Sequence, residues 1–202
     1  MKEDLRHLTG NIDIYLFDQL LKGTYVDCKA ILDAGCGQGR NIEYFLKNGY
    51  TIYGIDASAD HISKVKQMAL PFSGTSPQEN FRAALVEDLP FADGKFDLVI
   101  SSAVLHFASS VQHFEQMLHS MWRVISEGGF LFCRLASAIG IETLVKPVGD
   151  GRYMLPDGSE RFLVDQEMLL NLTAQLKGTL HEPLKTTNVQ NMRAMTTWCL
   201  RK

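Results

Sequence analysis

Residues 31–41 read Ile31-Leu32-Asp33-Ala34-Gly35-Cys36-Gly37-Gln38-Gly39-Arg40-Asn41. The apolar pair at the start predicts a short buried strand, and the apolar residues at 42, 45 and 46 are spaced as on a helix. The glycines between strand and helix lack the Cβ atoms that keep a ligand away from the backbone, and a helix start presents unpaired N–H groups. The segment therefore predicts a binding site for a small ligand.

Two ligand classes use such a turn, and the glycine spacing separates them. Dinucleotide folds use Gly-x-Gly-x-x-Gly, but here Arg40 stands where their third glycine would be. The segment instead resembles motif I of class I S-adenosylmethionine (SAM) dependent methyltransferases, an acid followed by x-Gly-x-Gly-x-Gly. Asp33, Gly35, Gly37 and Gly39 match that motif. The resemblance implies that the glycines cradle the methionine part of SAM, with Asp33 orienting its ammonium directly or through water.

A second acid stands where this kind of fold needs one. Asp56 closes the predicted strand 51–55, about 20 residues beyond the turn, where an acid binds the ribose hydroxyls. We therefore expect Asp56 to bind the ribose of the cofactor. The alternative is that Asp56 ends the strand, or begins the next helix, without binding a ligand.

A second resemblance to the same family lies further along the chain. Residues 87–100 read Glu87-Asp88-Leu89-Pro90-Phe91-Ala92-Asp93-Gly94-Lys95-Phe96-Asp97-Leu98-Val99-Ile100 and resemble the family's segment that enters the fourth strand. One departure is Leu85, where the family places the acid that binds the adenine amino group. Either Glu87 or Asp88 replaces that acid, or adenine is held by apolar packing and the Val86 N–H.

The apolar run 96–102 predicts a parallel strand covered by helices on both faces. Ligands in open α/β sheets bind outside the carboxyl ends of the strands, where the strand order reverses. We therefore expect Ser102 and Ala103 near the transferred methyl group. His106 matches the family's histidine after this strand and is the candidate catalytic base, the alternative being a packed histidine.

Residues 137–165 are rich in glycine and proline, as in a lid or binding loop. In the family, the insertion after the fifth strand often shapes the acceptor pocket, and the segment before the first strand folds over the SAM site. A solvated loop is the alternative for 137–165. The candidate substrate contacts are Tyr15, Phe107, Arg152, Tyr153 and Arg161.

Together these segments predict an α/β, Rossmann-like fold: a doubly wound, mostly parallel seven-stranded sheet that ends in an antiparallel hairpin. We expect the hairpin strands at 180–187 and 192–200. The third strand is expected at 81–86 and the fifth at 130–135. The chain is expected to form one domain, 1–202, with a helical cap at 1–28 and a lid insertion at 137–165.

Composition narrows the possible partners. A net charge of −3 over 202 residues gives no broad basic face, so a nucleic-acid partner is not expected. The four cysteines are widely spaced, which favours the reduced thiols of a cytosol. His113 and His119 lack a second ligand pair, so no metal site is expected. No apolar core follows Met1-Lys2-Glu3-Asp4, and no segment approaches ~18 apolar residues, so we expect a cytoplasmic protein without a membrane partner.

The resemblance implies methyl transfer from SAM by in-line displacement, with S-adenosylhomocysteine (SAH) as product. The acidic charge balance and the short chain favour a small-molecule acceptor, and we expect a monomer or homodimer. Segments 39–41 and 48–50 further resemble small tellurite-resistance-type methyltransferases. The alternatives are a methyltransferase acting on protein or RNA, a non-catalytic SAM or SAH binding module and, less favoured, a nicotinamide oxidoreductase. The expected cofactor contacts are Asp33, Gly35, Cys36, Gly37, Gly39, Arg40, Asp56, Ala57, Leu85, Val86, Glu87, Ser102 and Ala103.

Overall fold

A computed structural model describes residues 5–202, so Met1 to Asp4, at the start of the expected cap, lie outside the described residues. The helices are α1 (Leu5–Thr9), α2 (Ile14–Leu21), α3 (Ile42–Lys47), α4 (Ala59–Ala69), α5 (Val111–Val124) and α6 (Gln166–Gln175). Short 3-10 turns are η1 (Leu70–Phe72), η2 (Gln78–Asn80), η3 (Val86–Asp88) and η4 (Leu105–Phe107). None of the helices within 5–202 has the length and apolar character needed to cross a bilayer.

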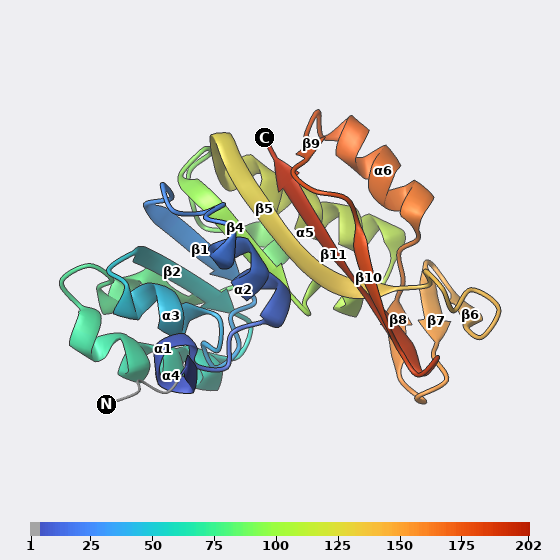
Figure 1. Cartoon of the computed structure of the whole chain (residues 1–202), viewed down its shortest axis with the longest axis horizontal. Helices are drawn as coiled ribbons and strands as arrows, with labels where there is room; N and C mark the ends of the chain where they lie inside the picture. The colour runs from blue at the N-terminus through green and yellow to red at the C-terminus, as the bar shows by residue number, and fades with distance from the viewer. Residues whose placement is uncertain (1–4) are drawn as a thin grey trace.

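The main sheet confirms the predicted fold class (Figure 1). Its strands are β1 (Ala30–Ala34), β2 (Thr51–Asp56), β3 (Phe81–Ala83), β4 (Phe96–Ser102), β5 (Ile125–Ser137), β9 (Thr179–Leu180), β10 (Lys185–Val189) and β11 (Arg193–Arg201). Seven of them follow the order β10-β11-β5-β4-β1-β2-β3, and the short β9 pairs with the end of β11. The five neighbouring strands β5, β4, β1, β2 and β3 run parallel to one another, whereas β11 is antiparallel to both β5 and β10.

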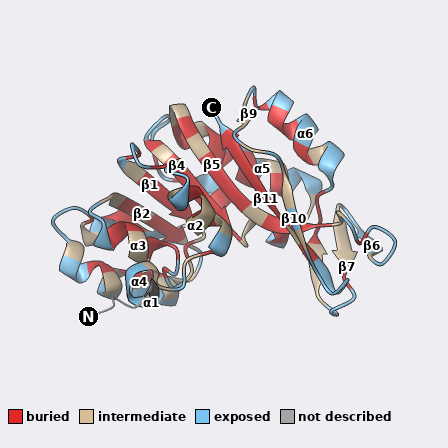
Figure 2. Ribbon diagram, viewed as in Figure 1, coloured by how far each residue is buried: buried red, intermediate tan, exposed pale blue. Residues whose placement is uncertain are grey.

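Helices cover both faces of the sheet because successive side chains of a strand point to opposite faces. Leu32 and its neighbour Val99 pack in the cluster that includes α5 and α6. Ile31 and its neighbour Leu98 pack on the other face, with α2, α3 and α4. Figure 2 shows the central strands as the buried part of the molecule. The sheet is therefore doubly wound, as predicted.

Three strands differ in length from the expectation. β3 ends at Ala83, and the chain turns into η3 through a bond from Asp88 N to Leu85 O. β5 extends from Ile125 to Ser137 because β11 pairs with residues 130–137 and β4 pairs with Ile125 at the other end. The strand expected at 180–187 is split into β9 and β10, and Pro183, which has no N–H to donate to a sheet, lies in the gap.

The segment 137–165 is more ordered than a turn-rich loop. It forms a second, antiparallel sheet of β6 (Lys146–Gly149), β7 (Arg152–Met154) and β8 (Glu160–Phe162), seen beyond the ends of β10 and β11 in Figure 1. Its base is joined to β5, since Ala138 N donates to Val164 O at 2.8 Å. The insertion is therefore held against the carboxyl end of β5.

Candidate functional site

The glycine turn after β1 is held against the end of β2. The backbone N–H groups of Gly35 and Cys36 both donate to Ile55 O, at 2.9 and 2.8 Å. Gly35 has φ +83, and a Cβ there would lie 2.5 Å from Val104 Cγ2, so the position requires glycine. Gly39 has φ +87 and faces Val65 and Met68 of α4. The first of these glycines brings the turn close to the end of β4, and the last one lets it pack on α4.

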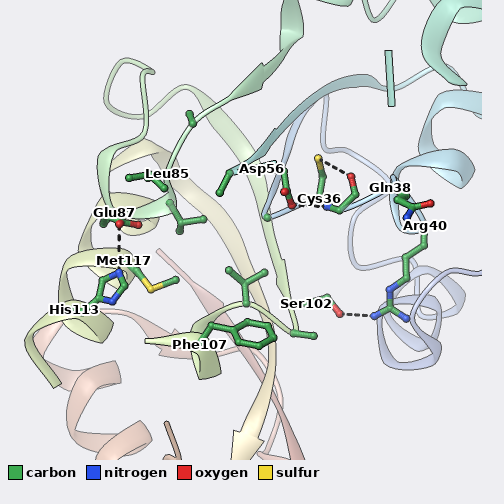
Figure 3. Close-up of a pocket in the computed structure, with 17 residues that line it drawn as sticks. Cys36, Gln38, Arg40, Asp56, Leu85, Glu87, Ser102, Phe107, His113 and Met117 are labelled. Atoms are coloured by element: carbon green, nitrogen blue, oxygen red, sulfur yellow. Dashed lines mark hydrogen bonds and ion pairs between the residues drawn. The ribbon is translucent and has the colours of Figure 1, made fainter. Parts of the chain in front are cut away.

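A cavity of about 500 Å³ opens at the carboxyl ends of β1, β2 and β4 (Figure 3). All of the expected cofactor contacts line it except Asp33 and Gly39. Its walls also contain residues that the sequence did not single out as contacts: Gln38, Ala84, Val104, His113 and Met117. Met117 was assigned to the core stripe of its helix, and it is buried as well as adjacent to the cavity. His113 and Met117 lie four residues apart on α5, so the face of that helix was the available signal.

Asp56 lies where the glycine turn meets the start of α4. Its Oδ2 accepts from Gly37 N at 2.9 Å, and its Oδ1 accepts from Ser58 N at 2.9 Å. The same Oδ1 lies 3.1 Å from His61 Nδ1. These bonds fix the carboxylate at the cavity wall, and lone pairs remain on both oxygens for a ligand hydroxyl.

Asp33 does not line the cavity. It is 1% exposed, and neither of its carboxylate oxygens has a hydrogen-bond partner among residues 5–202. Burial raises the pKa of Asp33 to about 7, and nearby Asp56 adds to this shift while Arg40 opposes it. The carboxylate that was expected to orient a ligand ammonium is therefore not part of the cavity wall.

The opposite end of the cavity is formed by the segment after β3. Leu85, where the family places an acid, is 53% exposed and lines the cavity. Glu87 also lines it, and its Oε1 lies 3.4 Å from His113 Nε2 (Figure 3). Asp88 does not line the cavity. Of the two acids considered as replacements for the one absent at position 85, Glu87 is therefore the one placed to meet a ligand.

Asp13, which sequence reasoning missed, connects the N-terminal cap to the cavity. Its side chain caps α2 by accepting from Tyr15 N at 3.0 Å. Its Oδ2 accepts from Arg40 Nη2 at 3.2 Å and from Arg134 Nη1 at 2.8 Å. Arg40 Nη2 also donates to Ser102 Oγ at 2.9 Å, a bond visible in Figure 3. The only local signal was an aspartate one residue before a helix.

His106 lines a second cavity, of about 470 Å³, on the other side of η4. Its Nδ1 accepts a hydrogen bond from Ala136 N at 3.2 Å. Burial, together with Arg161, lowers the pKa of His106 to about 4, so the ring is neutral and carries its proton on Nε2. The Nδ1 lone pair is therefore occupied and the ring offers an N–H donor, which favours the alternative of a packed histidine over a catalytic base.

The family assignment follows from a match over residues 32–133 to the family described as "Methyltransferase domain". The chain belongs to this family. The match runs from the middle of β1 to the middle of β5, so it contains the glycine turn, Asp56 and the end of β4. The cofactor of these class I methyltransferases is SAM, as the resemblance implied.

Curated relatives match this chain over part of their length. An uncharacterized methyltransferase of Synechocystis sp. is 34% identical over 99 residues, which are 49% of this chain and 43% of that protein. A malonyl-[acyl-carrier protein] O-methyltransferase of Enterobacter lignolyticus is 32% identical over 53% of this chain and 39% of its own. A ubiquinone biosynthesis O-methyltransferase of Chelativorans sp. is 29% identical over 76% and 63%. The chain thus spans less than two thirds of the length of each.

Solved structures agree on the fold at low identity. The 1,6-didemethyltoxoflavin-N1-methyltransferase of Burkholderia thailandensis has a TM-score of 0.70 at 17% identity, covering 96% of this chain and 80% of that one. The [4+2]-cyclase SpnF has a TM-score of 0.72 at 17% identity, covering 93% and 80%. Because a cyclase shares the fold, the fold alone does not assign a reaction to this methyltransferase family member.

The residues expected to contact a substrate do not all lie near the cavities. Phe107 lines the first cavity and is 62% exposed, and Arg161 lines the second. Tyr15, Arg152 and Tyr153 line neither cavity. The Tyr15 hydroxyl bonds Thr187 Oγ1, Arg152 Nη2 pairs with Glu160 Oε1 at 3.0 Å, and Tyr153 packs in a small apolar cluster of the insertion. The structure therefore gives these three side chains partners within the fold.

Proposed function

We propose that this protein transfers a methyl group from SAM to a small-molecule acceptor. The observation that carries the proposal is that two cavities share Ala103, at the carboxyl end of β4, as a lining residue. In the proposal, the first cavity holds SAM and the second holds the acceptor. The insertion 137–165 supplies part of the second cavity, in keeping with its expected role as a substrate lid.

The residues of the first cavity fit SAM. Its volume of about 500 Å³ falls within the range of small-molecule sites. The unpartnered carboxylate of Asp33 behind the turn suits a cationic ligand, because a buried acid without a partner is stabilised by a nearby positive charge. Asp56 would bind the ribose hydroxyls, Val86 and Glu87 would meet the adenine, and Arg40 would face the methionine carboxylate.

When bound, SAM supplies a methyl group on a positively charged sulfur, and in-line displacement transfers that methyl to a nucleophile. The chain contributes mainly position: Asp56 and the glycine turn fix the donor side, and the rigid end of β4 fixes the acceptor side. Ala103 is held there at φ +64, with its N–H donating to Arg134 O at 2.7 Å. Orientation of reactants in this way supplies about 7–11 kcal/mol in favourable cases.

A non-catalytic module that binds SAM or SAH is the second candidate, and Leu85 favours it. The family's adenine-binding acid is absent at this position, and the leucine side chain is half exposed at the cavity. Turnover separates the two functions. Release of SAH in the presence of a panel of acceptors supports the enzyme, and binding without any release supports the module.

Calorimetric titration with SAM, SAH and NAD tests the cofactor without knowledge of the acceptor. We expect both adenosyl ligands to bind and NAD not to bind. Asp56→Ala should abolish SAH binding, whereas Asp60→Ala, which removes an exposed acid of α4 paired with Lys64, should retain it. Thermal melting of each variant checks that it is folded. Binding of NAD alone, or unchanged SAH affinity in folded Asp56→Ala, would overturn the assignment.

A further inference from the structure

The second cavity is lined by three arginines from three different strands. Arg134 lies on β5, Arg161 on β8 and Arg193 on β11. One acid, Asp157, shares the wall, and its Oδ1 accepts from Ser159 N at 2.9 Å and from Ser159 Oγ at 2.6 Å. The charged side chains of this cavity are therefore predominantly positive, although the chain as a whole carries a net charge of −3.

These arginines have donor groups that the fold does not use. Within the described residues, the exposed Arg193 side chain forms no hydrogen bond or ion pair. The hydrogen bond from Ser159 lowers the pKa of Asp157, and the charges of Arg193 and Arg161 lower it further. Arg161 donates Nη1 to Glu160 O at 2.7 Å, and its guanidinium lies 5.0 Å from the centre of the Phe107 ring. Arg134 pairs with Asp13, but its buried Nε has no partner among residues 5–202. The cavity therefore contains guanidinium N–H groups that are free to donate to a ligand that accepts hydrogen bonds, and one of them, the Arg134 Nε, is buried.

His106 adds a neutral donor to the same wall. Because Ala136 N–H occupies its Nδ1, the ring offers the Nε2–H group. The rest of the wall includes the apolar side chains of Leu155, Val189 and Met195. The cavity therefore combines cationic and neutral donors with an apolar surface, which suits an oxyanion attached to an apolar body.

The segment from Ala103 to Phe107, which includes η4, lines both cavities. Ala103 belongs to both, and in η4 the adjacent residues His106 and Phe107 line the second and the first cavity respectively. Phe107 also lies against Arg161, so the cationic wall reaches the boundary with the first cavity. A molecule held in the second cavity would therefore have one end at the arginines and the other near Ala103.

We propose that the methyl acceptor is a small organic anion whose carboxylate or phosphate group is bound by Arg161 and Arg193 in the second cavity. The inference rests on the proposed function. The anion is the anchoring group, because guanidinium hydrogen bonds withdraw charge from the oxygens and make them poorer nucleophiles. The methylated atom is a different group of the same molecule, placed at the Ala103 end.

Binding to the SAH-saturated protein tests this proposal with three probes of one shape: benzoate, phenyl phosphate and the neutral benzamide. We expect at least one anion to bind at least tenfold more tightly than benzamide, and to bind more weakly as NaCl is raised. The anion that binds more tightly identifies the oxyanion the cavity prefers. Equal binding of all three probes, or no binding of either anion, would overturn the proposal.

Variants locate the site. Arg161→Gln and Arg193→Gln should each weaken binding of the anion at least tenfold, and Arg161→Lys should retain part of the affinity for the anion. Arg201→Gln is the matched control, since it removes the same charge from the exposed far end of β11. Thermal melting confirms that each variant is folded. An equal loss in the Arg201 variant, or no loss in the two cavity variants, would refute the placement.

The same titrations distinguish failure of this proposal from failure of the proposed function. If SAH does not bind but an anion binds with the expected dependence on Arg161 and Arg193, the anion site stands and the methyltransferase function falls. If SAH binds and neither anion does, the cofactor assignment stands and the anionic acceptor is refuted.

Discussion

Replacing Asp33 with asparagine should stabilise the ligand-free protein above neutral pH, although Asp33 belongs to the glycine motif. The Asp33 carboxylate is fully buried in β1 and has no hydrogen-bond partner among the described residues. Burial raises the pKa of this carboxyl from 3.8 to about 7. Its stabilising contribution is therefore fully present below pH 3.8 and is lost as the pH rises through about 7, because folding then buries a charge.

The size of the effect follows from this pKa difference. Between pH 5 and pH 8 the native carboxyl loses its proton, whereas the unfolded one is already ionised. At about 1.4 kcal/mol for each pKa unit, the two units between 5 and 7 remove about 3 kcal/mol of stability. Asparagine removes this pH dependence, but its buried amide also lacks partners, which costs about 1–3 kcal/mol at every pH.

Urea unfolding at pH 5, 6, 7 and 8 measures the effect directly. The unfolding free energy of Asp33→Asn minus that of the native protein should rise by about 3 kcal/mol from pH 5 to pH 8, or about 1–2 M in urea midpoint. Asp60→Asn, on the exposed side of α4, should show no such rise. Parallel pH profiles for the native protein and Asp33→Asn would refute the idea that Asp33 is buried without a partner.

Three further substitutions test the site. Gly35→Ala places a Cβ 2.5 Å from Val104 Cγ2 at φ +83, so it should lower the free energy of unfolding by about 1–3 kcal/mol and abolish SAH binding. Gly74→Ala, which has open space around it, should change neither the melting temperature nor the SAH affinity measured by calorimetry. Asp13→Ala removes the acceptor of two arginines and a helix cap, so urea unfolding should show a loss of about 2–4 kcal/mol; a loss below about 0.5 kcal/mol would contradict the network. Leu85→Asp supplies the missing acid and should tighten SAH binding about tenfold by calorimetry, and unchanged affinity would show that adenine is recognised elsewhere.

Local sequence determined the framework of this protein. Short-range patterns carry this information: the apolar runs of β1 and β4 mark buried parallel strands, and glycine at position 35 marks a backbone geometry that side chains avoid. Because strand order fixes where the carboxyl ends meet, Asp56 and Ser102 were placed at one cavity without knowledge of any long-range contact. The residues of the family motif, apart from Asp33 and Gly39, are also residues that line the first cavity.

Tertiary structure alone decided which side chains surround the second cavity and in what chemical state they are. Asp13 and Arg134 are 121 residues apart and form an ion pair, and Arg161 and Arg193 line one cavity although they lie in different sheets. The sequence offered His106 as either a base or a packed histidine, and only the fold brings the Ala136 N–H onto its Nδ1. Partners, burial and pKa depend on packing between distant segments, and no local pattern in the sequence records that packing.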